Sequence, residues 1–260
     1  TWIDALSKSG LIETPSYFFG KDGSAIQECS IDNTNGSRYL VLFHFVSGSA
    51  PEENKNLDTL YEKLGRLAGT CHNHVLSWEK PDNFERLTWD IDTIFGINAL
   101  WGNWRLAPEV TKEVQDKLER VELKIRGRLL DYGKSEKRFN LIHADMRLAN
   151  LLIDQESTRL IDFDDCGFGW FMYDFASAIS FIEDSPMVSY FKSSWIKGYK
   201  SVRELSFEDE KEIDTFIMLR RMALLAWIGS HIEAPEPQQL SAGFAETTAK
   251  LGDIWLNSLD

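Results

Sequence analysis

The sequence predicts an α+β protein with a small mixed first part and a large, mainly helical second part. Short apolar segments separated by polar turns fill much of the first 48 residues, as is typical of strands. Apolar residues at helical spacing dominate afterwards. With 43% hydrophobic residues among 260, the chain can bury a substantial core. The segment Ser47-Gly48-Ser49-Ala50-Pro51 interrupts an apolar strand and divides the chain into residues 1–48 and residues 49–260, which could form one large domain or two smaller lobes.

The first predicted element is a helix at the N-terminus. Thr1 and Asp4 have the spacing of a capping box, apolar residues follow at helical spacing, and Gly10 is a suitable stop. Strands are expected next at residues 18–19, 25–26 and 39–46, with turns at residues 21–23 and 33–36. The first lobe should therefore be one helix followed by an antiparallel sheet.

Helical patterns cover most of the second part. Residues 60–68 have amphipathic spacing, and residues 109–132 carry an apolar stripe, which more often faces a core than a ligand. The segment Cys71-His72-Asn73-His74 could suggest a metal site, but no further ligand pair lies nearby at zinc spacing. We favour a helix end whose imidazoles complement the helix dipole.

One short region of the second part combines chemically active residue types. Asp145 lies in a polar loop, Asn150 follows five residues later, and Asp162 ends an apolar segment. The residues between Asn150 and Asp162 read as two short strands joined by a polar turn at residues 155–158. Pairing of these strands would bring Asn150 and Asp162 together. A carboxylate beside two hard oxygen ligands is typical of a phosphoryl-transfer site that binds Mg²⁺.

This chemistry suggests a role for each side chain. Asp145 would act as catalytic base, accepting or orienting the proton of an acceptor hydroxyl. Asn150 and Asp162 would bind Mg²⁺ together with the phosphates of ATP. His143, two residues before the base, would brace the loop rather than react.

The motifs His143-x-Asp145-x4-Asn150, Ile161-Asp162-Phe163-Asp164-Asp165 and Gly167-x6-Asp174 resemble those of the aminoglycoside phosphotransferase and choline kinase-like superfamily. The chain is similar above all to its bacterial branch of phosphotransferase enzymes, which includes stress response kinase A and homoserine kinase type II-like proteins. The resemblance extends to a helix around residues 219–227. It implies a protein-kinase-like two-lobe fold with a truncated N-terminal lobe. It also implies ATP-dependent transfer of the γ-phosphoryl group to a hydroxyl of a small molecule or protein.

The resemblance also implies where the nucleotide binds. In the resembling family, the strand before the break at residues 47–51 forms a hinge against which adenine lies. Phe43, Phe45 and Val46 would then line the nucleotide pocket, with Leu152 and Ile161 closing it from below. Apolar side chains at these positions would equally suit an ordinary core.

Other residues near the motif have less definite roles. Asp164 or Asp165 could face the acceptor substrate or a second metal ion, while a loop cap or solvent exposure fits equally well. Trp170 could line the acceptor pocket, although large aromatic residues are commonly core elements. Asp174 opens an apolar segment as a good helix N-cap. The resemblance implies that Asp174 also ties the catalytic loop in place.

Two parts of a kinase site are not visible in the sequence. A glycine-rich loop and a strand lysine paired with a helical glutamate normally hold the nucleotide phosphates. No Gly-x-Gly-x-x-Gly motif occurs, and Lys8 and Lys21 fall in a predicted helix and a turn. We expect the missing strands to lie upstream of Thr1. A catalytically impaired kinase-like binding or interaction protein therefore remains an alternative hypothesis.

A third hypothesis is a hydrolase in which the aspartates and a metal ion activate water. It is weaker, because the aspartates lie close in sequence without histidine ligands nearby. The residues concerned are Asp162, Asp164 and Asp165.

Charge and cysteine content limit the partners. With 41 acidic and 28 basic residues the net charge is −13, which repels nucleic acid and anionic membranes. No apolar run approaches the roughly 20 residues of a spanning helix. Three widely spaced cysteines indicate neither a disulfide framework nor a zinc site, and no signal segment opens the chain. We expect a cytoplasmic protein that binds a nucleotide and a hydroxyl-bearing acceptor, but no nucleic acid or membrane.

Overall fold

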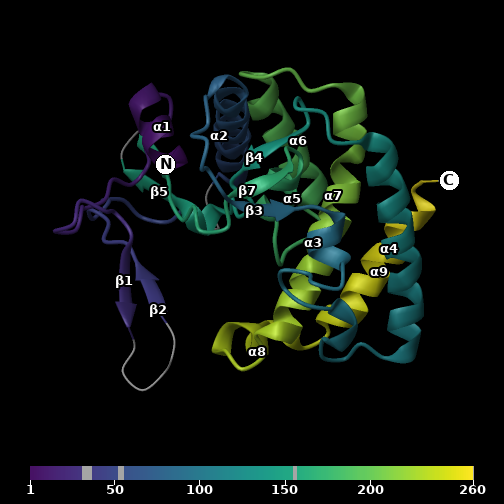
Figure 1. Ribbon diagram of the computed structural model, residues 1–260. Helices are drawn as coiled ribbons and strands as arrows, with labels where there is room; N and C mark the ends of the chain where they lie inside the picture. The colour runs from purple at the N-terminus through teal and green to yellow at the C-terminus, as the bar shows by residue number, and fades with distance from the viewer. Residues whose placement is uncertain (31–36, 52–55, 155–156, 260) are drawn as a thin grey trace.

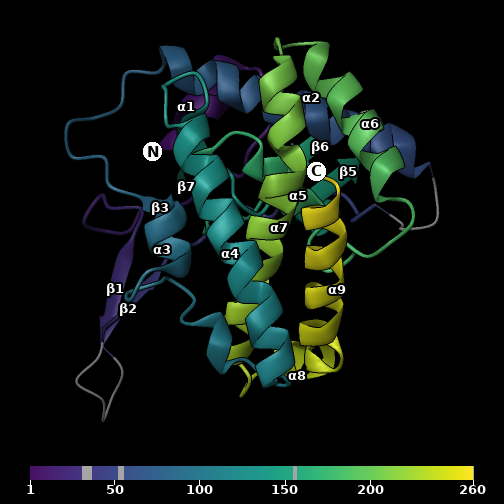
Figure 2. The same cartoon turned by 90° about the vertical axis from the view of Figure 1, so that its right-hand side faces the viewer.

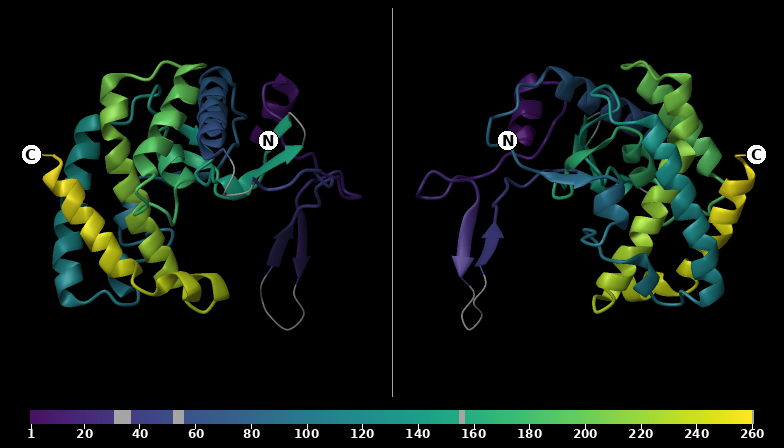
Figure 3. Two further views of the ribbon diagram at one scale, coloured as in Figure 1. Left: turned by 180° about the vertical axis from the view of Figure 1, so that it is seen from behind. Right: turned by 45° about the vertical axis from the view of Figure 1, so that its right-hand side comes forward.

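The computed structural model describes residues 1–30, 37–51, 56–154 and 157–259. These residues form an α+β structure in which a small N-terminal portion accompanies a mainly helical body (Figure 1). The hairpin of β1 (Gln27–Ser30) and β2 (Ser37–Leu40) projects away from that body in every view, most clearly in Figure 3. The predicted fold class is confirmed.

The N-terminal helix α1 (Trp2–Ser9) forms as the capping pattern predicts. The Thr1 hydroxyl oxygen accepts a hydrogen bond from the Asp4 amide, and the Asp4 carboxylate accepts from the Thr1 amino group. Gly10 ends the helix with φ 68°, a left-handed conformation that favours glycine. Trp2 and Leu6 are the buried residues of this helix and pack into the core.

The strands of the first lobe differ from the prediction: residues 18–19 and 25–26 form no strand, and β1 begins at Gln27. β1 and β2 pair antiparallel, but the expected strand at residues 39–46 is regular only as far as Leu40. Beyond it, Phe43 forms an isolated bridge with Tyr17, and the amide of Phe18 donates to the carbonyl of Leu42. A strand forms regular hydrogen bonds only where a neighbouring strand runs beside it. Among the described residues, residues 41–46 have only the short contact with Tyr17 and Phe18. The turn expected at residues 33–36 lies outside the described residues.

A three-stranded sheet and a separate hairpin lie beside the helical body. The sheet has the order β3 (Leu87–Trp89), β7 (Gly167–Trp170), β4 (Phe139–Ile142), with β7 parallel to β3 and antiparallel to β4. A Cβ atom on Gly167 would lie 2.5 Å from the Leu87 carbonyl oxygen, so the close approach of β7 to β3 requires glycine. The hairpin pairs β5 (Leu151–Asp154) with β6 (Ser157–Leu160), with Leu151 opposite Leu160.

The helical body consists of two packed groups. Figure 2 shows α4 (Lys112–Tyr132), α7 (Phe207–Ser230) and α9 (Phe244–Asn257) side by side, above α8 (Pro235–Ser241). The second group pairs α2 (Leu57–Ser77) with α6 (Val188–Lys200). α5 (Tyr173–Ala178) packs against α7, and a short helix α3 (Ile91–Phe95) follows β3. Short 3₁₀ turns lie at Trp104–Leu106 and Leu148–Asn150.

Glycine allows α2 and α6 to approach backbone to backbone. A Cβ atom on Gly65 would lie 1.9 Å from the Trp195 carbonyl oxygen, and one on Gly198 would lie 1.8 Å from the Glu62 carbonyl oxygen. No side chain fits either space. The close approach brings Tyr199 of α6 against α2.

The predicted long helices are present with shifted ends. α2 continues through residues 71–74, so His72 lies within the helix and not after it. α4 begins at Lys112 behind a Thr111 cap. The expectation that Asp174 caps a helix is wrong, because the cap of α5 is Met172 and Asp174 lies in the first turn. No helix among the described residues is long and apolar enough to cross a membrane.

Candidate active site

The loop that follows β4 is held by one buried carboxylate. Ala144 has φ 65°, a left-handed conformation that is uncommon outside glycine. Its amide donates to Asp174 Oδ1 at 2.7 Å, and the His143 amide donates to Asp174 Oδ2 at 3.3 Å. The amide of Met146, two residues after Ala144, donates to the Ser177 hydroxyl at 3.1 Å. Asp174 and Ser177 of α5 thus define the backbone path of the loop.

Asp174 is itself oriented from the rear by α2 and α6. His72 Nε2 lies 2.9 Å from Asp174 Oδ2, and His72 Nδ1 lies 3.0 Å from the Tyr199 hydroxyl. All three side chains are buried. Burial lowers the pKa of His72 although Asp174 opposes the shift, so the imidazole is neutral, donating to Asp174 and accepting from Tyr199.

His143 forms hydrogen bonds through both nitrogens of its ring. Its Nδ1 accepts a hydrogen bond from the Asp145 amide at 3.3 Å, which assigns the ring proton to Nε2. Nε2 then donates to the Ile161 carbonyl oxygen at 3.1 Å. The imidazole, buried beside the ring of Phe163, joins the loop to the segment after β6.

Asn150 connects the loop to the β5–β6 hairpin. Its Nδ2 donates to Asp145 Oδ2 and to the Asp145 carbonyl oxygen, both at 2.8 Å. The backbone carbonyl oxygen of Asn150 accepts a hydrogen bond from the Ile161 amide at 3.0 Å, which extends the pairing of the hairpin by one residue. Asp162 is the next residue, so the hairpin brings Asn150 and Asp162 to the same end.

Two side-chain groups at this end, each with an oxygen that could bind a metal ion, have no partner for that oxygen among the described residues. No hydrogen bond or ion pair is formed there by the exposed carboxylate of Asp162 or by Asn150 Oδ1. The described residues contain no cluster of three His, Cys, Asp or Glu side chains that could hold a metal ion. Two protein oxygens are nevertheless what Mg²⁺ uses when waters and nucleotide phosphates complete its coordination. The donor set fits such an ion.

Two arginines contact the carboxylate of Asp145. Arg220 of α7 donates from Nη2 to Asp145 Oδ1 at 2.9 Å. Arg147 Nε lies 3.1 Å from Asp145 Oδ1 and 3.2 Å from Oδ2. Sequence reasoning gave neither arginine a role. The available signal was the adjacent pair Arg220-Arg221 within an otherwise apolar run of a helix, where buried charges need partners.

Asp164 and Asp165 differ in exposure. Asp164 is exposed, and no side-chain partner for it occurs among the described residues. Asp165 is half-buried, and burial raises the pKa of its carboxyl although the Arg220 cation opposes the shift. The Asp165 carbonyl oxygen accepts from Trp89 Nε1 at 2.7 Å, and Arg86 bonds the carbonyl oxygens of Asp164 and Cys166. The backbone of this turn is therefore fixed while both carboxylates are left for other partners.

Trp170 lies in the core. It is almost fully buried, its Nε1 donates to the Gly133 carbonyl oxygen at 2.8 Å, and its ring packs against Phe139 and Phe216. β7 is the central strand of its sheet, hydrogen-bonded along both edges, and Trp170 belongs to the hydrophobic core cluster. The ring of the partly buried Trp101 has its centroid 5.0 Å from the guanidinium carbon of Arg220, which contacts Asp145.

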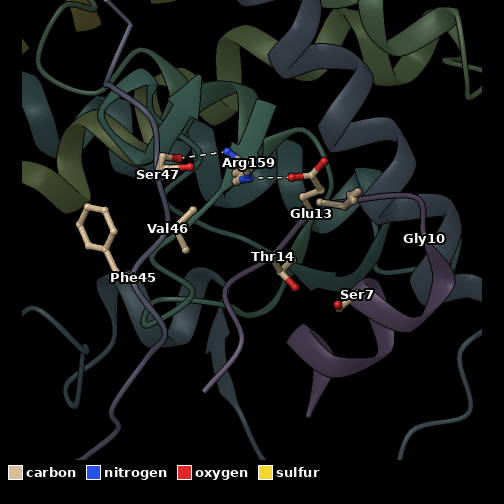
Figure 4. Close-up of a pocket in the computed structure, with 9 residues that line it drawn as sticks. Ser7, Gly10, Glu13, Thr14, Phe45, Val46, Ser47 and Arg159 are labelled. Carbon is tan, nitrogen blue, oxygen red and sulfur yellow. Dashed lines mark hydrogen bonds and ion pairs between the residues drawn. The ribbon is translucent and has the colours of Figure 1, made fainter. Parts of the chain in front are cut away.

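The expected nucleotide-pocket residues do not all line one cavity. Phe45 and Val46 line a cavity of about 330 Å³ between the end of α1 and the segment at residues 45–47 (Figure 4). The Phe45 ring points away from the other lining residues, and the residue is 95% exposed. Phe43 instead bridges to Tyr17. Leu152 and Ile161 are partly buried in and after the hairpin and do not line this cavity.

The segment after Val46 is attached to the β5–β6 hairpin. Ser49 and Ile153 exchange amide–carbonyl hydrogen bonds of 3.0 and 2.9 Å. Arg159 donates to the Ser47 carbonyl oxygen at 3.0 Å and to the Glu13 carboxylate at 2.6 Å, as the dashed lines in Figure 4 show. Gly48, with φ 132°, has the Leu152 Cβ only 3.1 Å from the place of its own missing Cβ. This packing holds the predicted hinge against the strand that carries Leu152.

A sequence profile of the phosphotransferase enzyme family matches residues 1–205, which include the loop, the hairpin and Asp174. The chain belongs to this family. Its members are phosphotransferases, and the expectation of an enzyme of this class is confirmed. The family match covers every residue of the predicted motif, from His143 to Asp174.

Solved structures of kinases share the fold. The microcompartment-associated aminopropanol kinase is 37% identical and superposes with a TM-score of 0.91, covering 99% of this chain and 80% of that protein. The amicoumacin kinase hAmiN, solved with AMP-PNP, Ca²⁺ and Ami, is 20% identical with a TM-score of 0.76, covering 96% of this chain and 75% of that protein. Choline kinase LicA from Streptococcus pneumoniae is 15% identical with a TM-score of 0.62, covering 98% and 78%.

One curated relative agrees with this assignment. Amicoumacin kinase of Bacillus subtilis (strain 168) is 26% identical over 239 residues, which span 86% of this chain and 67% of that protein. Together with the structural matches, it confirms the resemblance to aminoglycoside phosphotransferases and choline kinases and the protein-kinase-like fold.

Proposed function

We propose that this phosphotransferase moves the γ-phosphoryl group of ATP to a hydroxyl group of a small molecule, with Asp145 as catalytic base. The observation that carries the proposal is the position of Asn150. Its amide nitrogen holds Asp145, while its Oδ1 is left for a cation beside Asp162. One side chain thereby sets the distance between the proposed base and the proposed metal ligands.

The proposed reaction uses the loop as it stands. Asp145 accepts the proton of the acceptor hydroxyl while that oxygen forms a bond to the γ-phosphorus and the bond from phosphorus to the ADP oxygen breaks. Asp145 is held on both carboxylate oxygens, which limits its rotation. Holding the reacting groups in place is the main contribution of a protein to this chemistry.

Asn150 and Asp162 are the proposed ligands of a divalent cation. When bound, Mg²⁺ would neutralise negative charge on the nucleotide phosphates. Support comes from the side-chain oxygens of Asn150 and Asp162, which have no partners among the described residues, and from the hAmiN complex, which contains AMP-PNP and Ca²⁺. His143 holds Ile161, the residue before Asp162, and so keeps the proposed ligand in place.

We propose that ATP binds where residues 43–46 meet the β5–β6 hairpin. The residues proposed to lie near its adenine ring are Phe43, Phe45, Val46, Leu152 and Ile161. The attachment of Ser49 to Ile153 supports this placement, because it fixes the predicted hinge beside the hairpin that presents Asp162. Residues 1–48 and 49–260 are the proposed lobes on either side of that hinge.

We propose a small amino alcohol as the acceptor. The relative of 37% identity is an aminopropanol kinase, whose printed name gives such a compound. The carboxylates of Asp164 and Asp165 lie in the same turn as Asp162 and have no side-chain partners in the described part of the chain. One of them is suited to bind the ammonium group of the acceptor. A cytoplasmic location remains a prediction.

Paired substitutions in the protein as expressed from its gene test the proposal. With Mg·ATP and 1-aminopropan-2-ol, Asp145→Asn should reduce kcat by about 100-fold or more while Mg·ATP binding is retained. Asp162→Asn should instead weaken Mg·ATP binding, and asparagine tolerates the φ of 63° at this position. Asp116→Asn, at an exposed α4 position, is the control. Unchanged kcat in Asp145→Asn would refute the assigned base.

The alternative is a catalytically impaired binding protein. It is favoured by the lack of a glycine-rich loop in the sequence and by the positions of Lys8 on α1 and Lys21 in a turn. Isothermal titration of Mg·ATP into the 260-residue chain separates the two hypotheses. Binding followed by acceptor-dependent ADP release supports the kinase, and binding without ADP release supports the alternative. Phosphate release without a nucleotide would instead revive the hydrolase hypothesis.

A further inference from the structure

Arg220 places a cation inside the helical body. It lies in the middle of α7 with only 2% of its surface exposed. Its guanidinium donates from Nη2 to Asp145 Oδ1 at 2.9 Å and from Nε to the Ser180 hydroxyl at 3.0 Å. Nη1 lies 3.5 Å from the Tyr173 hydroxyl. These partners come from two segments of the chain, the loop of Asp145 and residues 173–180 in and just after α5, which the guanidinium joins.

Asp145 is the carboxylate that compensates this buried charge. A guanidinium removed from water is costly unless it is paired and hydrogen-bonded. The only ion pair of Arg220 among the described residues is with Asp145. The rings of Trp101 and Tyr173, with centroids 5.0 and 5.6 Å from the guanidinium carbon, add favourable cation–π contacts. Burial alone would lower the pKa of Arg220, but Tyr173 and Asp145 hold its pKa above the usual value.

The contacts divide the Asp145 carboxylate into a buried side and an open side. Arg220 holds Oδ1 and Asn150 holds Oδ2, and both of these partners are buried. Arg147, the third partner, is about 30% exposed and lies almost equally far from both oxygens. An acceptor hydroxyl must therefore approach from the Arg147 side.

We infer that Arg220 is a positioning residue, which fixes the plane of the Asp145 carboxylate and ties it to the segments of Trp101 and Ser180. The inference rests on the proposed function of Asp145 as base. In this role Arg220 acts through Asp145, whose Oδ1 it contacts, and not on the acceptor itself. Its contribution lies in the angle at which Asp145 meets the acceptor hydroxyl.

Arg221 offers a matched control in the next position of the same helix. It is also 2% exposed and also paired with a buried carboxylate, that of Glu183, at 2.6 Å. Its Nε donates to the Thr248 hydroxyl at 2.9 Å, and its guanidinium carbon lies 3.5 Å from the Phe244 ring centroid. It has no contact with Asp145. Loss of Arg221 should thus cost stability in a similar way without disturbing the base.

The experiment compares Arg220→Met, Arg220→Lys and Arg221→Met in the protein as expressed from its gene. Unfolding by urea, Mg·ATP binding, and kcat and KM for 1-aminopropan-2-ol are measured for each. We expect Arg220→Met to lower kcat about 100-fold and to leave the affinity for Mg·ATP unchanged. The magnitude is that expected when a reacting group, here Asp145, is displaced by about 1 Å. Arg220→Lys should recover part of the rate, because lysine keeps the charge but not the directed fork of donors. Arg221→Met should keep the wild-type kcat.

Chemical rescue provides a test that a purely structural role would not pass. Guanidinium ion at millimolar concentration should restore part of the kcat of Arg220→Ala and leave Arg221→Ala unchanged. A kcat within about threefold of wild type in both Arg220→Met and Arg220→Lys overturns the inference. So does loss of activity that merely parallels unfolding in the variants of both arginines. Wild-type protein that binds Mg·ATP but transfers no phosphoryl group overturns the proposed function, and the inference with it.

Discussion

Asp174 Oδ1 accepts a 2.7 Å hydrogen bond from the amide of Ala144, the residue immediately before the proposed base. Ala144 has φ 65°, so this bond compensates a backbone conformation that alanine rarely adopts. The bond therefore links the fold of α5 directly to the direction in which Asp145 leaves the backbone.

Asp174→Asn should damage both stability and catalysis. The side-chain NH2 group introduced at position 174 would face at least one buried backbone N–H, so that neither could form a hydrogen bond there. We expect a loss of about 3 kcal/mol in the free energy of unfolding. We also expect about a 100-fold lower kcat, because Ala144 would leave its conformation. Urea unfolding and steady-state kinetics measure these effects, with the exposed Asp184→Asn as control. A folded variant with unchanged kcat would contradict the proposed link.

The neutral state of His72 predicts a loss of stability in mild acid. Burial lowers its pKa in the folded protein, so below about pH 6.5 the unfolded chain binds more protons than the folded one. Stability should fall as the pH decreases through this window, by at most about 1.4 kcal/mol per pH unit from this residue. The pKa of His74 is also lowered by burial and adds to the trend.

Substitution isolates the contribution of His72. The free energy of unfolding in urea is measured at pH 7.5 and at a lower pH. The difference between the two values should be smaller for His72→Gln than for the wild type. The exposed His231→Gln should keep the wild-type difference. Equal pH dependence in the wild type and His72→Gln would show that the imidazole is not the source.

Gly198→Ala should be strongly destabilising. The added Cβ would lie 1.8 Å from the Glu62 carbonyl oxygen, so α6 must move away from α2. We expect a cost of about 3 kcal/mol or more in the free energy of unfolding. Gly127→Ala is the control, because no atom lies within 4 Å of its Cβ position on α4, and it should gain up to about 1 kcal/mol. Similar effects of both substitutions would argue against the close approach.

Trp170→Phe should lower stability without changing acceptor recognition. The ring packs on Phe139 and Phe216, and its Nε1 donates to the Gly133 carbonyl oxygen. Losing the indole should cost about 1 to 2 kcal/mol. KM for the acceptor should remain at the wild-type value in steady-state assays. A raised KM with normal stability would place Trp170 in the acceptor pocket.

Local patterns predicted the elements that local chemistry determines. The capping box at Thr1 and Asp4 produced α1, and two short apolar runs formed the hairpin that brings Asn150 to Asp162, although β6 begins at Ser157, inside the segment expected as a turn. The position of Asp162 beside Asn150 follows from strand length alone, since pairing continues one residue past Leu151 and Leu160. These features need only short-range sequence information.

The remaining features depend on contacts between distant segments. Arg220 reaches Asp145 across 75 residues, and His72 reaches Asp174 across 102, so no spacing rule reveals either pair. The strand expected at residues 39–46 ends at Leu40, because strand formation depends on a partner strand as well as on propensity. Trp170 is buried because Phe139 of β4 and Phe216 of α7, both distant in sequence, pack against its ring.

The backbone contact between α2 and α6 has a consequence for engineering. Because glycine sets the helix spacing, the positions of His72 and Tyr199 do not depend on how large side chains are packed elsewhere. Arg147, on the side from which the acceptor hydroxyl approaches Asp145, belongs to neither helix. The acceptor specificity of this chain should therefore be open to redesign around Arg147, while the contact between α2 and α6 that supports the loop is left untouched.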